Sequence, residues 1–320
     1  MQADVQVLLA GVSDASDARA GCPGCAVTIS AECAASRELR MRACRSCGTL
    51  SAWPVPSQEE LGAYYNSDYS VSDAGLTRRR RANWTPLLET AERGAGARNG
   101  LEVGSSTGAF LRLAVERGWS MAGVELDARA RRQHAETSPD IPVYSTIEAA
   151  RSAGVGGVEA AWVLHTIEHL PDPEAVLREL SGLLAPGALI VATTPNGRSL
   201  ECRVLGPLWE WWTPPAHLTL FSPRGARLLF ERAGLEIVSI ETRRGDSSGA
   251  ATNLALSPAR LLKRYLRGER RQRSSVSSAT QRTAACINLL YDPLSKPIRP
   301  ALYRSHLGPE LVIVARNPSG

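Results

Sequence analysis

Short apolar runs alternate with amphipathic stretches between about Leu87 and Val238. This alternation is typical of βαβ units, in which a buried strand is followed by a helix that crosses back over the sheet. We therefore predict an α/β core with a largely parallel sheet. The predicted strands cover residues 99–103, 120–125, 141–144, 159–164, 188–193 and 235–241, and a last strand lies at 310–316.

Two Cys-x-x-Cys pairs precede this core. They are Cys22-Pro-Gly-Cys25 and Cys44-Arg-Ser-Cys47, separated by 18 residues. Four thiolates at this spacing can occupy the corners of a tetrahedron, which suits a closed structural zinc site. Redox pairs are the alternative, but neither pair follows a strand at the start of a helix, where a thioredoxin-type pair belongs. We predict a zinc ribbon in which the metal stabilises the fold.

These patterns divide the chain into four parts. The expected parts are a flexible tail at 1–21, the zinc ribbon at 22–52, a Pro-punctuated connector with Tyr64, Tyr65 and Tyr69 at 53–86, and the core at 87–320 with a basic insert at about 245–308.

Composition limits the protein class. Of the 320 residues, 43% are hydrophobic and 22% charged, which excludes disorder as the main state. No apolar run approaches the roughly 18 residues of a membrane span, and the first residues lack a basic signal region, so we expect a cytoplasmic protein. Seven cysteines are too few for a disulfide scaffold in a chain of this length.

The net charge of +5 conceals one strongly basic segment. Residues 260–304 contain eleven basic and two acidic residues, and apolar positions share one helical face among arginines. Such a helix can lie on an anionic membrane surface, which would place the protein at the inner face of a membrane. An anionic substrate or a solvated lid is the alternative.

A glycine-containing turn follows the first predicted strand, in the order Glu102-x-Gly104-x-Ser106-x-Gly108. Glycines there let the backbone approach a ligand, and the following helix offers free N–H groups. Glu125 ends the next apolar run, where a carboxylate can accept both hydroxyls of a ribose. A nicotinamide site would require Gly-x-Gly-x-x-Gly, but the frame here is Gly104-x-Ser106-x-x-Ala109. An S-adenosylmethionine site instead needs an acid just before the first glycine, which Glu102 supplies.

The turn resembles motif I of class I S-adenosylmethionine-dependent methyltransferases, with Ser106 in place of the middle glycine. Two further segments resemble the ubiquinone O-methyltransferase branch. Residues 160–196 contain its His-Leu-Pro-Asp-Pro sequence at the start of a helix, and residues 214–241 contain its His followed by Phe-Ser at the start of the next helix. The ribbon and connector resemble those ahead of the core in sugar C-methyltransferases. The resemblance implies a Rossmann-like seven-stranded sheet with the last strand antiparallel. It also implies S-adenosylmethionine-binding residues, which would be Glu102, Gly104, Ser106, Gly108, Glu125, Leu126 and His165.

The implied function is methyl transfer to a small-molecule acceptor: a sugar, nucleotide sugar, polysaccharide precursor or natural product. We favour oxygen over carbon as the methylated atom, because the larger C-terminal domain of sugar C-methyltransferases is missing from this sequence. An RNA methyltransferase is one alternative, since a zinc ribbon also precedes this core in rRNA guanine methyltransferases. Nucleic acid is nevertheless not the partner that we expect. A non-catalytic zinc-ribbon binding protein is the second alternative.

Histidines supply the candidate catalytic groups. His169 follows the fourth strand and His217 follows the tryptophan-rich stretch 209–212, and we predict either as the general base. His165 would line the donor pocket through its backbone. In ubiquinone O-methyltransferases the stretch around His165 resembles Glu-x-x-Glu-His and is associated with a divalent metal. Here His165 stands in place of the first glutamate, so we favour a role of His169 in holding the loop, and a metal at Glu168 and His169 is the alternative. The three tryptophans suggest a stacked acceptor, and we expect His134 and His306 to be solvated.

Overall fold

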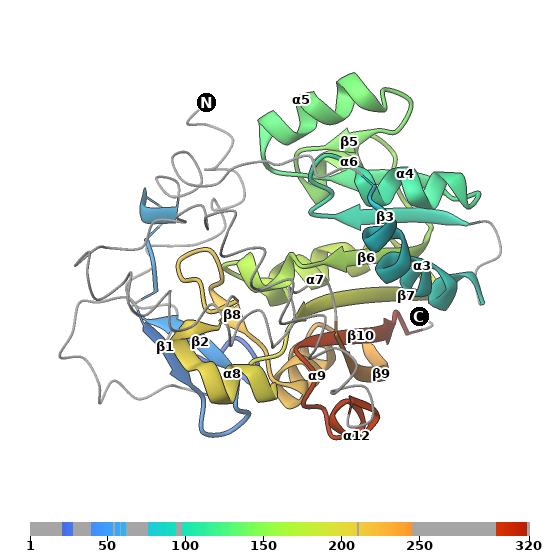
Figure 1. Ribbon diagram of the computed structural model, residues 1–320. Coiled ribbons are helices and arrows are strands. Elements are labelled where there is room, and N and C mark those ends of the chain that lie inside the picture. Colours follow the sequence, from blue (N-terminus) through green and yellow to red (C-terminus); the bar gives the residue numbers. More distant parts are fainter. Residues whose placement is uncertain are drawn as a thin grey trace, which may run out of the picture.

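The computed structural model (Figure 1) describes residues 21–27, 40–53, 55–57, 59–61, 76–93, 98–209, 211–244 and 299–318. The tail up to residue 20, the tyrosines of the connector and residues 245–298 of the basic insert lie outside the described residues, so the predictions for them stay predictions. No helix in the described part of the chain is long and apolar enough to span a bilayer.

One seven-stranded sheet forms the core. Its strands are β3 (Asn99–Val103), β4 (Ser120–Val124), β5 (Val143–Tyr144), β6 (Val158–Leu164), β7 (Leu184–Pro195), β9 (Glu236–Arg243) and β10 (Glu310–Arg316). They lie in the order β5-β4-β3-β6-β7-β10-β9, and β10 runs antiparallel to both of its neighbours. The predicted seven-stranded sheet with an antiparallel last strand is therefore confirmed, and each predicted strand overlaps an observed one.

Helices cover both faces of the sheet. The described helices are α3 (Arg78–Glu92), α4 (Ala109–Glu116), α5 (Ala128–Thr137), α6 (Ile147–Ser152), α7 (Pro173–Ser181), α8 (Leu200–Leu205), α9 (Pro223–Arg232) and α12 (Arg299–Arg304), with short 3-10 turns η1 (Ile167–His169) and η2 (Gly206–Leu208). Apolar residues of α3 and α4 pack with Trp162 on one face, whereas those of α6, α7 and α9 pack with Leu101 and Val103 on the other. The result is a three-layer α/β/α core.

The ribbon contributes a second, smaller sheet. Strands β1 (Arg40–Ala43) and β2 (Leu50–Trp53) form an antiparallel hairpin, and β8 (Thr219–Leu220) pairs with β2 as the third strand. Figure 1 shows β1 and β2, in blue, beside β8 and α8. Because β8 comes from the core segment, ribbon and core share a sheet.

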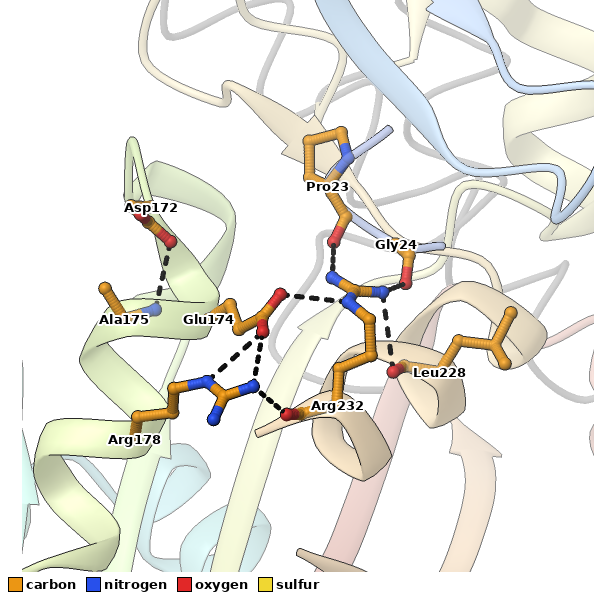
Figure 2. Close-up of polar contacts among 8 residues, drawn as sticks. All are labelled: Pro23, Gly24, Asp172, Glu174, Ala175, Arg178, Leu228 and Arg232. Atoms are coloured by element: carbon orange, nitrogen blue, oxygen red, sulfur yellow. Dashed lines mark hydrogen bonds and ion pairs between the residues drawn. The ribbon is translucent and has the colours of Figure 1, made fainter. Parts of the chain in front are cut away.

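A polar contact also fixes the ribbon to the helices of the core (Figure 2). The guanidinium of Arg232, at the end of α9, donates to the carbonyl oxygens of Pro23 (3.0 Å) and Gly24, while its Nε donates to Glu174 of α7 (2.9 Å). Arg178 donates to the same carboxylate at 2.8 Å. One arginine thus joins the first cysteine turn to two helices.

The packing between ribbon and α9 is close. Ser222 caps α9 and donates from Oγ to the carbonyl oxygen of Cys47 (2.6 Å). A Cβ atom at Gly225 would lie 1.9 Å from Oγ1 of the fully buried Thr49. Only a glycine at 225 lets α9 approach the ribbon at this distance.

Candidate functional site

The carboxyl ends of β3, β4 and β6 lie side by side. In the parallel pairing, Glu102 of β3 lies opposite Gly123 of β4 and Trp162 of β6. Two residues farther along β6, Leu164 lies opposite Thr193 of β7. The loops that follow these strands therefore meet at one edge of the sheet. Ligands of open α/β folds bind at that edge.

The loop after β3 is held by the end of β4. The amides of Gly104 and Ser105 both donate to the carbonyl oxygen of Val124, at 2.8 and 3.1 Å. Gly104, Ser106 and Gly108 all have positive φ, at 80°, 48° and 77°. Such angles favour glycine, and Ser106 adopts one despite its side chain.

Neighbouring side chains fill the space beside both glycines. A Cβ at Gly104 would lie 2.1 Å from Oγ1 of Thr166, and one at Gly108 would lie 2.1 Å from Nδ1 of His134. Both glycines are thus needed for packing against Thr166 and against His134 of α5, as well as for the backbone turn.

His134 is not solvated, so that prediction is wrong. Only 2% of the residue is exposed, and its Nε2 lies 2.8 Å from the carbonyl oxygen of Ile141. Arginines surround it in the sequence, but the 3.6-residue period turns Ala130 and His134 to the buried side of α5 and leaves Arg129 and Arg132 exposed. The imidazole packs against Gly108, at the end of the glycine loop.

Two acids lie behind this loop. Each oxygen of the half-buried Glu125 carboxylate accepts one backbone N–H, from Ser106 and from Asp127, both at 2.8 Å. Burial raises the pKa of Glu125. Leu126 is half-buried beside it, and its carbonyl oxygen accepts a hydrogen bond from Arg131.

Glu102 is the more unusual of the two acids. It is 4% exposed, and its Oε2 has no hydrogen-bond partner. Burial raises the pKa of Glu102 well above the ordinary value, and the nearby Glu125 raises it further. A buried carboxyl without a partner is costly unless something compensates it. A cationic ligand at this edge would do so.

His165 turns toward the last strand. Its Nε2 lies 2.5 Å from Oε1 of Glu310, whose other oxygen accepts from Nε of Arg243. Burial alone would lower the pKa of His165, but the charges of Glu310 and Glu168 outweigh it and raise the pKa to about 10. His165 has a φ of 50°, and its backbone amide donates to the carbonyl oxygen of Thr193. Donor binding through this backbone stays a prediction.

Glu168, His169 and His217 lie together. One potential ligand atom from each lies within 4.8 Å of the other two, and the rings of His169 and His217 are 4.7 Å apart. Glu168 and His169 come from η1, whereas His217 immediately precedes Leu218, whose amide donates to the carbonyl oxygen of Glu168 (2.9 Å). The two predicted catalytic histidines are therefore neighbours.

The charges in this cluster are set by burial and by the cluster members. Burial alone would raise the pKa of Glu168, but His165, His169 and His217 together lower it to about 2. Burial and the neighbouring His169 lower the pKa of His217 to about 3. At neutral pH an ionised carboxylate therefore faces a neutral imidazole.

The tryptophans differ in role from one another. Trp209 is buried in a cluster with ribbon residues such as Met41 and Leu50, so it does not offer a stacking face for an acceptor. Trp211 stacks between His165 and His217, with ring centroids at 5.2 and 5.5 Å. The stretch 209–212 thus packs the ribbon and orders the histidines, and the acceptor-stacking prediction is wrong for Trp209.

The four predicted zinc ligands also lie together. The Sγ atoms of Cys22 and Cys47 are 3.5 Å apart, those of Cys25 and Cys44 are 3.6 Å apart, and all four lie within 4.8 Å of one another. A tetrahedral zinc with bonds of about 2.3 Å has sulfurs about 3.8 Å apart. The thiols therefore fit a zinc ion with small adjustments.

Sequence reasoning missed Glu310 and Arg243. Glu310 begins a predicted strand 145 positions after His165, and nothing in the local pattern links the two residues. Only the antiparallel register, which sets Glu310 opposite both Arg243 and Pro195, brings it to the site.

A profile described as a methyltransferase domain matches residues 76–240. The ubiquinone biosynthesis O-methyltransferase of Psychrobacter arcticus is 32% identical over 115 residues, which cover 34% of this chain and 45% of that protein. The C-methyltransferase NovU of Streptomyces niveus is 27% identical over 226 residues, or 68% of this chain and 50% of NovU. The matches thus span about half the length of each of these relatives.

Among solved structures, the [4+2]-cyclase SpnF superposes with a TM-score of 0.50 at 17% identity, covering 83% of this chain and 99% of SpnF. At this identity the likeness concerns the fold alone.

Proposed function

The chain belongs to the methyltransferase-domain family, and we propose that it transfers a methyl group from S-adenosylmethionine to a small-molecule acceptor. The observation that carries the proposal is the buried carboxyl of Glu102, which lies behind the glycine loop with one oxygen unpartnered. That group fits the cationic end of the donor's methionine part.

The donor's remaining contacts follow from the same edge of the sheet. Each oxygen of Glu125 uses one lone pair for a backbone N–H and keeps another for a ribose hydroxyl. Gly104, Ser106 and Gly108 form the wall of the donor site, with Leu126 against the adenine and His165 beside the methionine part. When bound, the sulfonium supplies an electrophilic methyl group, and the protein's task is to align it and to move one proton.

The acceptor would meet His169 and His217. The Nδ1 of each ring is within 2.7 Å of a carbonyl oxygen, which leaves Nε2 as the proton-accepting nitrogen. We propose that an acceptor hydroxyl gives up its proton to this pair, or to a ligand that the pair holds. The pKa of His217, lowered to about 3, keeps the ring neutral but makes it a weak base, so its Nε2 would accept a hydrogen bond from the acceptor hydroxyl rather than hold the proton.

We favour an oxygen nucleophile over carbon. A hydroxyl can be deprotonated directly by a group at this position, whereas a carbon acceptor also needs an adjacent group to stabilise a carbanion. The likeness to both an O- and a C-methyltransferase is compatible with either atom. Sugars, nucleotide sugars, polysaccharide precursors and natural products are the proposed acceptor classes.

We further propose that Cys22, Cys25, Cys44 and Cys47 hold a structural zinc ion. The four ligands leave no open coordination position, so this metal would stabilise the ribbon without taking part in catalysis.

Residues 260–304 are the proposed contact for an anionic acceptor or, at the inner face of a membrane, for anionic lipid. The support is the sequence, with eleven basic and two acidic residues. Flotation with anionic vesicles at low salt tests the lipid contact; a chain that stays at the bottom of the gradient refutes it.

The main proposal is tested by calorimetric titration of the protein with S-adenosylmethionine, followed by transfer of a labelled methyl group to candidate acceptors. Binding that competes with S-adenosylhomocysteine is expected. The proposal fails if neither compound binds.

A further inference from the structure

One side chain attaches the first cysteine turn of the ribbon to α7 (Figure 2). The guanidinium of Arg232 donates to the carbonyl oxygens of Pro23 and Gly24, the two residues between the first pair of cysteines. Its Nε donates at 2.9 Å to the carboxylate of Glu174, in the first turn of α7. Only 26% and 29% of these two charged side chains are exposed, so water screens the ion pair only in part.

Helix α7 is in turn closely connected to His169. Only Leu170, Pro171 and Asp172 separate this histidine, the last residue of η1, from the first residue of α7. Proline has a fixed φ, and Asp172 caps α7 by accepting a hydrogen bond from the amide of Ala175 at 2.9 Å. The connection therefore has little freedom to absorb a movement of α7, and a displacement of its first turn is passed on to His169.

The second cysteine turn is attached to the segment that carries His217. Ser222 donates from Oγ to the carbonyl oxygen of Cys47 at 2.6 Å. The amide of Ala52, in β2, donates at 2.8 Å to the carbonyl oxygen of Leu218, which directly follows His217 and leads into β8. Each cysteine turn thus holds a segment that carries one of the two histidines.

The two segments meet at the histidine pair. Nδ1 of His169 lies 2.7 Å from the carbonyl oxygen of Ala216. The amide of Leu218 donates at 2.9 Å to the carbonyl oxygen of Glu168, and the rings of His169 and His217 have centroids 4.7 Å apart. The spacing of the rings therefore depends on where η1 lies relative to the segment before β8. The ribbon is attached on both sides of this junction.

From these contacts we infer that the ribbon is a positioning element of the acceptor site. It sets the spacing of His169 and His217, and Arg232 is the positioning residue that connects the ribbon to His169. A metal held by both cysteine turns would join the two attachments into one clamp. The role in the acceptor site rests on the proposed function, whereas the clamp itself is a property of the free protein.

The donor side lies outside this clamp. The attachments run through α7, α9 and β8, whereas Glu102 and Glu125 lie at the ends of β3 and β4. A loosened ribbon should therefore disturb the histidines and leave the donor site intact. Placement matters for the histidines, because a shift of about 1 Å in a positioned group can reduce a rate by about 100-fold.

The test follows the Nδ1 protons of His169 and His217 by NMR in the full chain. Each Nδ1 faces a backbone carbonyl oxygen, which can only accept, so each carries a proton that should give a downfield signal and exchange slowly with water. His169→Gln and His217→Gln assign the two signals by deleting them.

Arg232→Gln should shift the signal of His169 and speed its exchange with water by about 10-fold, because it frees α7 from the ribbon. Glu174→Ala should have the same effect, although it leaves the contacts of Arg232 with the ribbon in place. The double variant should change the signal no further, because both changes act through one connection. Arg227→Gln is the matched control on α9: its ion pair with Glu231 is exposed, and both histidine signals should stay unchanged.

Removal of the ribbon metal with a chelator should change the signals of both histidines, and zinc should restore them. S-adenosylmethionine is titrated into the same samples by calorimetry, and its affinity should stay within about twofold of the wild-type value. Signals that do not respond to the chelator overturn the role of the metal in the clamp.

An unchanged His169 signal in Arg232→Gln, or single effects that add in the double variant, overturns the inference. Glu174→Ala decides the matter if Arg232→Gln does not fold, as judged by thermal unfolding. Donor binding that is lost together with the His169 signal would show that the ribbon supports the whole core, which also overturns it. Absent donor binding in the wild type refutes the proposed function, and the His169 signal still decides whether the clamp exists.

Discussion

His165 and Glu310 join two distant parts of the chain through a contact of 2.5 Å between Nε2 and Oε1. His165 follows β6, whereas Glu310 is the first residue of β10, and Arg243 of β9 donates to the same carboxylate. Burial raises the pKa of Glu310, but His165 and Arg243 lower it by more, so the group stays ionised. Glu310 thus pairs with two cations at the edge of the sheet, one of which, His165, also lies 3.4 Å from Glu168.

Replacing Glu310 with Gln should destabilise the fold by about 3 kcal/mol, because it removes the counter-charge of Arg243 and leaves His165 with Glu168 alone. Urea denaturation measures the change in the free energy of unfolding. Glu236→Gln, on the exposed side of β9, should alter it by less than about 0.5 kcal/mol. Equal effects of the two changes would contradict the importance of the pair.

Donor affinity should rise with pH through the raised pKa of Glu102. At low pH the free protein carries a proton on Glu102, and a cationic donor must displace it, so binding is weakened and releases a proton. Above that pKa the carboxylate is already ionised, and the affinity should become constant. Calorimetry in buffers of different ionisation enthalpy measures the proton released.

Glu102→Gln should remove this pH dependence and weaken donor binding by about 10-fold to 100-fold, since an interaction with a charged group contributes about 1.5–3 kcal/mol. The unchanged thermal stability of the variant is the control. An affinity for S-adenosylmethionine that still rises with pH in the variant would assign the titration to another group.

Gly225→Ala should destabilise the protein by about 2 kcal/mol, because the added Cβ would meet Thr49 of the ribbon. A loss of stability in this variant would be informative, because Ala normally makes a helix about 1 kcal/mol more stable than Gly does. Gly156→Ala, in the loop before β6, is the control for the substitution without a clash, because a Cβ there meets nothing within 4 Å. Thermal unfolding of both variants measures the difference, and a stabilised Gly225→Ala would show that the ribbon can move away from α9.

Removal of the proposed ribbon zinc should loosen β8 while sparing the proposed donor site. Cys22→Ser disrupts one thiolate ligand, and β8 is held by pairing with β2. Hydrogen exchange at Thr219 and Leu220 should accelerate at least 10-fold. Affinity for S-adenosylmethionine should change less than twofold, because Glu102 and Glu125 lie at the carboxyl ends of β3 and β4, which belong to the seven-stranded sheet. Unchanged exchange at β8 would mean that the strand does not need the metal.

Local patterns predicted the strands, and with them the strand ends at which the proposed donor residues lie. A βαβ unit repeats over a short stretch of sequence, so the alternation of apolar and amphipathic segments shows where each strand ends. Glu102, Gly104 and Glu125 lie at such strand ends. The four cysteines were also predictable, since each pair forms a local turn.

The rest depended on tertiary register. The direction in which His165 points is set by Glu310, and the burial of His134 is set by its contact beneath Gly108. Trp209 looked available for an acceptor because it lies in a tryptophan-rich stretch between two predicted elements, yet ribbon residues cover it. None of these contacts lies within one helix or one turn, so local periodicity carries no information about them.

The pairing of β8, which comes from the core segment, with the hairpin of the ribbon has a consequence for how this protein can change over evolution or in the laboratory. His217 precedes a strand that completes the ribbon's sheet, and Gly225 follows it at the closest approach of ribbon and helix. A ribbon taken from a relative would arrive without its third strand. The smallest transplantable piece is therefore discontinuous in the gene: the cysteine turns with their hairpin, together with residues 217–225.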